Sequence, residues 1–444
     1  MSPDHGARRH RNGHIHAIAR HGVDRHGPAL RRHDRGAADA PIVAAHRNHP
    51  VPGMARTRFR PAAGLPPAPP PGPALPPPAT AADDTPATTP RRPIVGYVMD
   101  GPGLPSISAD KLDAINFAFA LVDPGGEAYL PGATAPASLA GLTALRARNP
   151  ALKVLVSIGG WGADHFSEAA LTPQSRARFN ASAMRLLREH GLDGIDIDWE
   201  YPTLPGPGIS HRPQDRENFS LLLEDLRARL DVLGREHGRH YLLTIAAADG
   251  EAARGLELAR IARVLDWINL MTYDFHGSLS DTTGHHAGLG RSRRAPAGSR
   301  TTVQAVDEFL AAGVPAARLN VGVAFYGREF ADVDPVDDGL YRRYGRYVDA
   351  LPWRDLRTLA GRDGYVRHWD PDAQAPYLWN AATRHFVSYD DPQSLAAKAA
   401  FVRARGLGGM MYWEHRHDID DELLDALRTG LDAPAAATTR ETPR

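Results

Sequence analysis

Short apolar runs alternate with amphipathic stretches along the chain from Pro93 onward. The runs are rich in Val, Ile, Phe and Tyr, and side chains of these types favour buried β-strands. Eight such runs can be counted: Ile94–Val98, Ile115–Leu121, Lys153–Gly160, Gly194–Tyr201, Tyr241–Ala248, Trp267–Asp274, Leu319–Tyr326 and Gly409–Glu414.

Between these runs, Leu and Phe recur at three- and four-residue intervals, as in Ser175–His190 and Arg216–Glu236. This spacing places apolar side chains on one face of a helix. Strands that alternate with helices are typical of βα units around a parallel sheet, and eight strands favour a closed barrel. The predicted fold class is α/β, a TIM (β/α)8 barrel.

One gap between the predicted strands is much longer than a βα unit requires. Residues 327–394 follow the seventh strand and are rich in Tyr, Trp, Asp and Gly, so we expect a small inserted α+β domain. Loops after barrel strands build the active site of this fold, so the insertion should form a wall of the substrate cleft. We expect Trp353, Trp369 and Trp379 to pack in its core.

The two ends of the chain differ in composition from the predicted barrel, which we place at residues 93–431. Residues 1–92 are rich first in His and Arg and then in Pro and Ala. Such a segment buries too little apolar surface to fold, so we expect disorder there and in the tail at 432–444. Irregular spacing of the histidines favours a solvated tail over a metal site. The prolines interrupt the apolar core that a signal peptide needs.

Charge and composition restrict the partners. The 444 residues include 52 basic and 52 acidic side chains and no cysteine. A chain with this balance lacks the positive field that gathers nucleic acid or anionic lipid, and no apolar run approaches the roughly 18–20 residues that span a bilayer. We expect a monomer with a neutral or polar substrate and with no nucleic-acid or membrane partner.

Three carboxylates stand at alternate positions of the fourth predicted strand. Because side chains alternate across a strand, Asp196, Asp198 and Glu200 should share one face at roughly 6–7 Å intervals, with Glu200 at the carboxyl end. Like charges this close cannot all stay ionised, so one pKa should rise and provide a general acid. The alternatives are an exposed acidic strand face and a divalent metal site at Asp196 and Asp198.

Residues 193–200 read Asp-Gly-Ile-Asp-Ile-Asp-Trp-Glu and resemble the DxxDxDxE signature of glycoside hydrolase family 18, the chitinase family. Four further segments resemble motifs of this family in the correct order, from the third strand through the start of a chitinase insertion domain to the eighth strand. They are Ser157–Trp161, Met271–Asp274, Tyr326–Arg328 and Met411–Trp413. The resemblance extends from about Pro93 to Leu431.

The resemblance implies hydrolysis of β-1,4-linked N-acetylglucosamine polymers by a retaining, substrate-assisted mechanism. Glu200 would be the acid and then the base, while the substrate's own acetamido oxygen attacks the anomeric carbon. Asp198 would orient the acetamido group, Asp196 would share a proton behind it, and Tyr273 would bind the acetamido oxygen. Neither a cofactor nor a metal is implied. Asp193 would be a structural member of the motif.

The same resemblance implies a set of sugar-binding residues. Trp413 is the expected aromatic floor beneath the scissile sugar, whereas Trp161 could serve either an outer subsite or packing. Phe117 and Phe119 should share a strand face, and Phe119 is the better candidate to line the central subsite. The full set is Tyr97, Phe119, Trp161, Tyr201, Met271, Asp274, Tyr326, Arg328 and Trp413.

One departure from the family pattern follows Trp413. The segment Glu414-His415-Arg416-His417-Asp418 is unusually charged, which could alter an outer subsite. We expect these to be exposed loop residues rather than a metal site or a second acid–base group.

Two other functions remain possible at this stage: a non-catalytic chitin-binding lectin, and a hydrolase of the N-glycan core or of peptidoglycan. Because chitin is an external polymer, we expect a secreted protein that acts on chitin or chitooligosaccharide.

Overall fold

The computed structural model describes residues 91–434, so the expectations for residues 1–90 and 435–444 lie outside this range. Eight parallel strands form a closed barrel, because β1 pairs with β14 on one side and with β2 on the other. The ninth strand of this sheet, β3 (Ala128–Tyr129), is an antiparallel addition to β2. The α/β barrel prediction is confirmed. The barrel strands are β1 (Ile94–Met99), β2 (Ala114–Val122), β4 (Lys153–Gly159), β5 (Gly194–Asp198), β6 (Leu242–Ala247), β7 (Trp267–Leu270), β8 (Leu319–Ala324) and β14 (Gly409–Trp413).

The strands place apolar side chains on both of their faces. Ile195 and Ile197 of β5 point outward into a large core that they share with the surrounding helices. Trp199 extends this layer and stacks on Phe166, with 5.4 Å between the ring centroids. Fully burying a side chain of this size contributes about 1.5–3 kcal/mol, so this outer layer is the main source of stability. A smaller cluster that includes Tyr97 fills the interior.

The two helices expected from their periodicity are present as α3 (Pro173–Glu189) and α4 (Asp215–His237). Thr172 and Ser175 form a reciprocal capping box at the start of α3, and α4 ends at Gly238, whose φ is +63°. The other α-helices are α1 (Ala135–Ala144), α2 (Phe166–Leu171), α5 (Gly250–Ala253), α6 (Leu258–Ile261), α7 (Thr302–Ala311), α8 (Trp353–Leu356), α9 (Pro392–Ala404) and α10 (Glu422–Asp432). Short 3-10 helices are η1 (Ala109–Lys111), η2 (Leu145–Ala147), η3 (Ala316–Arg318), η4 (Val336–Gly339) and η5 (His415–His417).

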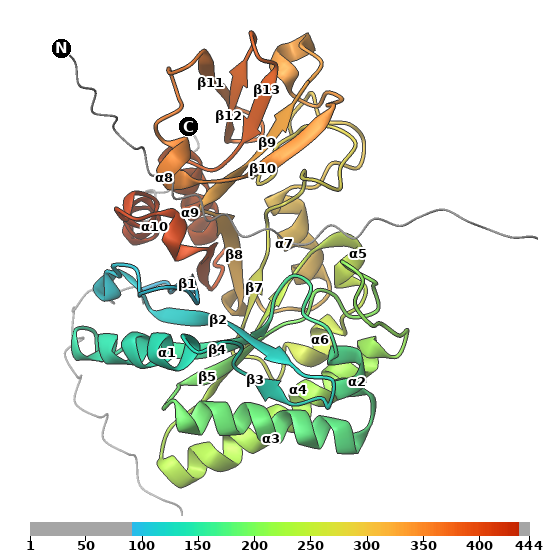
Figure 1. Ribbon diagram of the computed structural model, residues 1–444, viewed down its shortest axis with the longest axis vertical. Coiled ribbons are helices and arrows are strands. Elements are labelled where there is room, and N and C mark those ends of the chain that lie inside the picture. The colour runs from blue at the N-terminus through green and yellow to red at the C-terminus, as the bar shows by residue number, and fades with distance from the viewer. Residues whose placement is uncertain (1–90, 435–444) are drawn as a thin grey trace, which may run out of the picture. The chain divides into compact units, whose positions relative to one another are not determined.

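A second, antiparallel sheet is inserted between β8 and α9 and forms a lobe separate from the barrel sheet (Figure 1). Its strands, in spatial order, are β10 (Arg346–Pro352), β9 (Tyr326–Ala331), β13 (His385–Ser388), β12 (Ala375–Asn380) and β11 (Tyr365–Asp370). Of the three tryptophans expected in the core of this lobe, Trp379 is buried there. Trp353 is buried in the large cluster that contains residues of both the barrel and the lobe, and its ring stacks on Tyr389 at 6.3 Å. Trp369 is only partly buried and lies under the Arg367 guanidinium.

Two predicted strands are shorter than expected, and both end on the side where the site lies. We predicted strands at 194–201 and 267–274, but β5 ends at Asp198 and β7 ends at Leu270. The pairing explains the first case, because Asp198 is the last residue of β5 that pairs with β4. Glu200 therefore stands on the loop after the strand.

Phe117 and Phe119 do not share a strand face, so that prediction was wrong. The register between β2 and β4 shifts between Ala118 and Ala120, which leaves Phe119 as an extra residue in β2. A bulge of this kind re-aims one side chain. Phe117 consequently packs in the outer core, while Phe119 packs with the interior cluster.

Candidate active site

Asp196 lies inside the barrel, and none of its surface is exposed. Its Oδ2 accepts hydrogen bonds from the hydroxyls of Tyr97 at 2.8 Å and Ser157 at 2.7 Å. Its Oδ1 accepts one from the Thr244 hydroxyl at 2.5 Å. Ser157 and Thr244 are the direct register partners of Asp196 on β4 and β6. Burial raises the pKa of Asp196, although the three donors oppose this effect.

Asp198 is the next inward side chain on β5 and is almost fully buried. Within residues 91–434, its Oδ1 has no hydrogen-bond partner. Burial raises the pKa of Asp198 well above its usual range, and the carboxylates of Glu200 and Asp196 raise it further. A buried carboxyl without a cationic partner is costly when ionised, so this environment favours a proton shared within the row.

Glu200 is partly buried on the loop after β5. Burial raises the pKa of Glu200 to about 7, while the Tyr201 hydroxyl lowers it and the charge of Asp274 raises it. A carboxyl with this pKa is protonated in about half of the molecules at neutral pH, so it can both donate and accept a proton. The arrangement can therefore act as an acid and a base in turn.

Tyr273 extends the interior layer on the loop after β7. Its hydroxyl lies 3.9 Å from Sδ of Met411, and a thioether sulfur is a weak acceptor. Burial raises the pKa of Tyr273 well above its usual range, so the hydroxyl keeps its proton and stays a donor. Met271 is partly buried in the same interior cluster.

Asp274 joins the barrel to the lobe. Arg328 of β9 donates two hydrogen bonds to its carboxylate, at 2.7 and 2.6 Å, and the Tyr326 hydroxyl donates a third at 2.8 Å. Nδ1 of the fully buried His286 lies 3.5 Å from Asp274 Oδ1. Burial raises the pKa of Asp274, but His286 and Arg328 outweigh that effect and hold it well below its usual range. Asp274 therefore stays charged.

Aromatic side chains line the same end of the barrel. Trp413 stacks on Phe119 with a centroid distance of 5.4 Å and an interplanar angle of 16°. The Tyr97 ring also contacts Trp413, with 5.7 Å between the ring centroids and the two planes tilted. Trp161 is 57% exposed and meets Tyr201 edge-on at 6.3 Å, so it is not packed in the core. Flat exposed rings of this kind suit the apolar faces of sugars.

The charged segment after Trp413 was expected to be exposed, and this expectation was wrong for most of it. Glu414, His415 and Asp418 are almost fully buried, and His417 is partly buried. The His415 ring lies between the Tyr412 hydroxyl at 2.9 Å and the Ser106 carbonyl at 2.8 Å. Backbone and hydroxyl partners satisfy Glu414 and His415, which is why these two can leave solvent, whereas His417 Nδ1 and Asp418 Oδ1 have no hydrogen-bond partner within residues 91–434.

Several residues of the site were not singled out from the sequence as functional. Thr244 and His286 stand in no recognised motif, and Ser157 is part of one without an expected role of its own. A usable signal for Thr244 was its inward position on the strand beside Asp196. Asp193, expected to be structural, is buried and bound by Arg146, Arg239 and the Val154 N–H.

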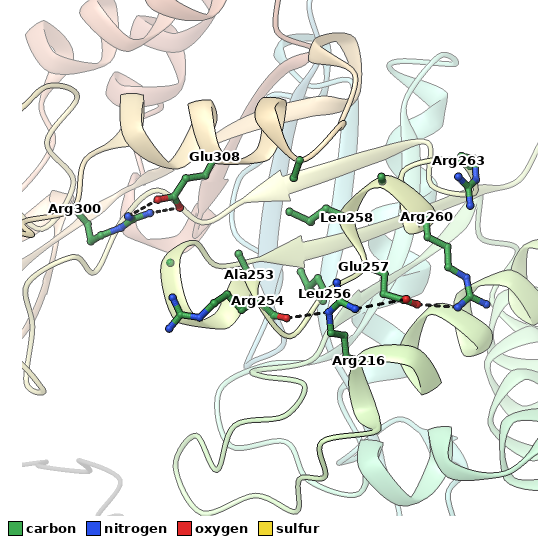
Figure 2. A pocket seen from close by; sticks show the side chains of 13 residues that line it. Arg216, Ala253, Arg254, Leu256, Glu257, Leu258, Arg260, Arg263, Arg300 and Glu308 are labelled. Atoms are coloured by element: carbon green, nitrogen blue, oxygen red, sulfur yellow. Dashed lines mark hydrogen bonds and ion pairs between the residues drawn. The ribbon is translucent and has the colours of Figure 1, made fainter.

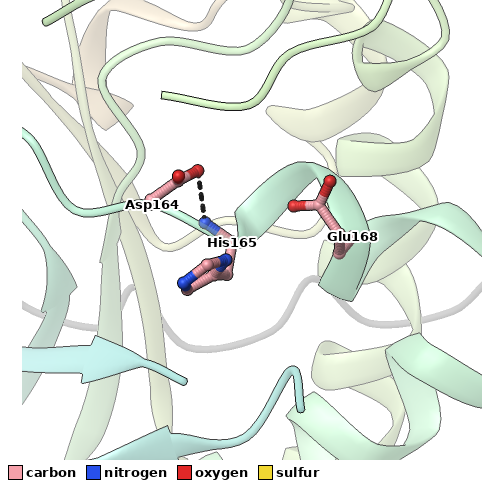
Figure 3. Close-up of side chains that lie close together, drawn as sticks. All are labelled: Asp164, His165 and Glu168. Carbon is pink, nitrogen blue, oxygen red and sulfur yellow. Dashed lines mark hydrogen bonds between the residues drawn. The ribbon is translucent and has the colours of Figure 1, made fainter. Parts of the chain in front are cut away.

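A possible metal-binding group and a pocket lie away from these carboxylates. Asp164, His165 and Glu168 could together approach an ion (Figure 3), but Asp164 accepts two hydrogen bonds from Ser210 and Glu168 pairs with Arg212 at 2.8 Å. Those donors already occupy the carboxylates.

A pocket of about 780 Å³ lies beside α5, α6 and α7 (Figure 2), and none of the carboxylate-site residues lines it. Its Arg260 and Arg300 are each paired with two acids. Ion pairs therefore neutralise these two arginines. We place the candidate active site at the carboxylate row inside the barrel and not at this pocket.

Comparison with known proteins agrees with this geometry. The family model for glycosyl hydrolases family 18 matches residues 90–418. Chitinase A1 of Niallia circulans is 39% identical over 322 residues, which are 67% of this chain but only 46% of that protein, so the chain spans about half its length. Chitinase B of Serratia marcescens is 32% identical over 72% of this chain and 76% of its own length.

Solved structures give the same result. A family 18 N-acetylglucosaminidase from Paenibacillus barengoltzii is 39% identical, with a TM-score of 0.72, and the match covers 77% of this chain and all of that one. The family match extends over most of the chain and includes every residue of the carboxylate row. The chain therefore belongs to glycosyl hydrolase family 18.

Proposed function

We propose that this glycoside hydrolase cleaves β-1,4-linked N-acetylglucosamine polymers or oligomers with retention and with assistance from the substrate. The observation that carries the proposal is the row of carboxylates at the end of β5, with Asp196 and Asp198 buried and Glu200 partly buried beyond them, where desolvation raises the pKa of Glu200 to about 7. Glu200 is the proton donor of this row, and Asp198 behind it has one oxygen, Oδ1, without a hydrogen-bond partner, which can bind a ligand. The chitinases among the relatives support the same substrate class.

In the first step, Glu200 donates its proton to the glycosidic oxygen as the bond between that oxygen and the anomeric carbon breaks. The carbonyl oxygen of the substrate's acetamido group forms a new bond to the anomeric carbon, which gives an oxazolinium ion. Water then attacks the same carbon, the bond between this carbon and the acetamido oxygen breaks, and Glu200 takes up the water's proton. The configuration is therefore retained, and the acetamido group and the acid form of Glu200 are restored.

The neighbouring groups orient the acetamido group. Asp198 accepts a hydrogen bond from the acetamido N–H and offsets the positive charge of the oxazolinium. Asp196, deeper in the barrel, shares a proton with Asp198. Tyr273 donates to the acetamido oxygen. Trp413 lies under the scissile sugar. Tyr97, predicted to contact the sugar, is buried and supports the site through its hydrogen bond to Asp196. The remaining predicted contacts line the path of the sugar chain: Phe119, Trp161, Tyr201, Met271, Asp274, Tyr326 and Arg328.

The lobe takes part in this proposal through residues 326–328, because Arg328 is a lobe residue that holds Asp274. We assign residues 93–431 to the catalytic barrel and 327–394 to the inserted domain. Within residues 91–434, no helix is long and apolar enough to cross a membrane. Since chitin lies outside cells, we further propose that the protein acts as a secreted monomer.

The test is release of 4-methylumbelliferone from N-acetylchitooligosaccharide conjugates by the wild-type chain and by Glu200→Gln. Loss of the acid should lower kcat by about 10²–10⁴-fold while chitin binding persists, because the shape of the site is kept. If the wild-type chain and Glu200→Gln were both inactive but both bound chitin, the protein would be a chitin-binding lectin and the proposed hydrolysis would be wrong. A fully deacetylated polymer should not be cleaved, and its efficient cleavage would exclude the substrate-assisted step.

A further inference from the structure

Three consecutive residues after Trp413 bind the loop that follows β1. The Arg416 guanidinium donates to the carbonyls of Met99 at 3.2 Å and Gly103 at 2.7 Å. His415 lies 2.8 Å from the Ser106 carbonyl, and the Glu414 carboxylate accepts the Met99 N–H at 3.4 Å. We call Glu414, His415 and Arg416 the clasp.

Glycine at position 101 allows the clasp to lie close to the opposite loop. A Cβ atom at Gly101 would stand 3.3 Å from Nη2 and 3.4 Å from Cζ of Arg416. The guanidinium is therefore in near contact with the backbone there, and it occupies the space where another residue would project a side chain. Arg416 remains partly exposed, so it faces solvent on one side.

The clasp directly follows Trp413 and joins the ends of β14 and β1. These two strands are not direct neighbours of β4 and β5, which carry Trp161 and Tyr201 at their ends. β14 and β1 are neighbours in the barrel, as are β4 and β5, and β2 lies between the two pairs. Trp161 and Tyr201 follow β4 and β5 and contact each other. Glu200 protonates the leaving oxygen, so the leaving chain extends past these two rings. With Trp413 beneath the retained sugar, as proposed above, the non-reducing chain would extend on the side away from β4 and β5, toward the loops after β1 and β14.

We propose that Arg416 and the clasp close the non-reducing side of the sugar path, so the protein removes mono- and disaccharides from non-reducing chain ends. This inference rests on the proposed function and adds the position of cleavage. The similarity to a family 18 N-acetylglucosaminidase over the whole length of that chain supports it. Hydrogen bonds to three backbone carbonyls hold the clasp in place, so it narrows the path without the need for bound substrate.

The experiment uses chitohexaose labelled with 2-aminobenzamide at its reducing end and follows the labelled products at early times by mass spectrometry. The wild-type chain should give labelled penta- and tetrasaccharide first. Arg416→Ala should increase the share of labelled trisaccharide and shorter products by about tenfold, because an opened path admits longer non-reducing segments. Arg416→Met keeps the aliphatic stem but loses the guanidinium, so it should show the same change in products. It serves as the test if Arg416→Ala folds poorly.

Arg318→Ala is the matched control. Arg318 also bridges two segments by donating to backbone carbonyls, those of Ala262 and Leu265, but it precedes β8 at the opposite end of the barrel. This variant should lower the Tm and leave the product pattern unchanged. Early labelled di- or trisaccharide from the wild type, or an unchanged pattern in both Arg416 variants, would overturn the inference. Absence of any hydrolysis by the wild type would instead reject the proposed function, on which the inference rests.

Discussion

At the scale of single residues, the site depends on how firmly each carboxyl holds its proton. Asp274 is charged because Arg328 and His286 hold its pKa well below the usual range. That charge is one of the factors that raise the pKa of Glu200 to about 7, after burial. A residue of the β7 loop thus acts on the acid of the β5 loop through space.

The influence of Asp274 on Glu200 can be measured from the pH dependence of kcat/KM. Glu200 is protonated below its pKa and loses the proton as pH rises through about 7, so kcat/KM should fall above that pH. Asp274→Asn removes a negative charge and leaves Arg328 uncompensated, and both changes favour the ionised form of Glu200. The alkaline limb of the pH–kcat/KM profile should therefore move to lower pH.

Asp370→Asn provides the comparison for this shift. Asp370 is also a carboxylate that a histidine contacts, His285 at 3.1 Å, but it belongs to β11 of the lobe and Glu200 is not among its neighbours. Its replacement should leave the alkaline limb unchanged. If the alkaline limb of Asp274→Asn stayed at the wild-type pH or moved to higher pH, the proposed influence of Asp274 on the pKa of Glu200 would be wrong.

Spacing along the chain was enough to place Asp196 and Asp198 on one inward face, because strand alternation is a local property. The partners of Asp196 could not be identified in the same way. Ser157 and Thr244 reach it from other strands, and only the register between strands determines that they do. His286 was also missed, because it reaches Asp274 from a loop that has no periodic pattern.

At the scale of elements, the bulge in β2 decides which phenylalanine faces the site. Alternation predicted one face for Phe117 and Phe119, but this rule assumes an unbroken ladder with the neighbouring strand. The shift beside Ala118 breaks the ladder and gives the two rings different environments. The ends of β5 and β7 were misplaced for a related reason, since apolar composition continues beyond the last paired residue.

Alanine substitutions should separate the two rings. Phe117 is fully buried in the outer core, so Phe117→Ala should lower the free energy of unfolding by about 3–5 kcal/mol. Phe119 is partly exposed and stacks on Trp413, so Phe119→Ala should cost less than about 2 kcal/mol but reduce kcat/KM by about tenfold. Urea unfolding and steady-state kinetics measure the two effects. Equal losses of stability would contradict the different environments of the two rings.

At the scale of the whole molecule, the barrel and the lobe meet at one junction, which includes the contact between Arg328 and Asp274. The eight strands and the position of the insertion were predictable, because βα repetition and an overlong gap are visible in the sequence. The contacts between the two parts were not, since they join residues far apart in the chain. Arg328 of the lobe binds Asp274, and Trp353 packs in the cluster that contains residues of both parts.

The junction includes an ion pair with no exposed surface. Lys398 of α9 donates to Asp390 at 2.6 Å, just after the last lobe strand, and Ser394 donates to the same carboxylate at 2.7 Å. Removing one partner of such a pair leaves a buried charge without compensation. Lys398→Met should therefore lower the free energy of unfolding by about 3–5 kcal/mol, measured by urea denaturation.

Two further variants show whether this loss comes from the unpaired charge or from altered packing. Lys398→Met combined with Asp390→Leu removes both charges, so it should recover much of the lost stability, since apolar residues of similar volume can replace a buried pair. Arg405→Met breaks the exposed Arg405–Asp307 pair and should change stability by only about 0–1 kcal/mol. If the double variant were as unstable as Lys398→Met, packing around the lysine stem would be the cause. The buried charge would then not be what holds the lobe strand against α9.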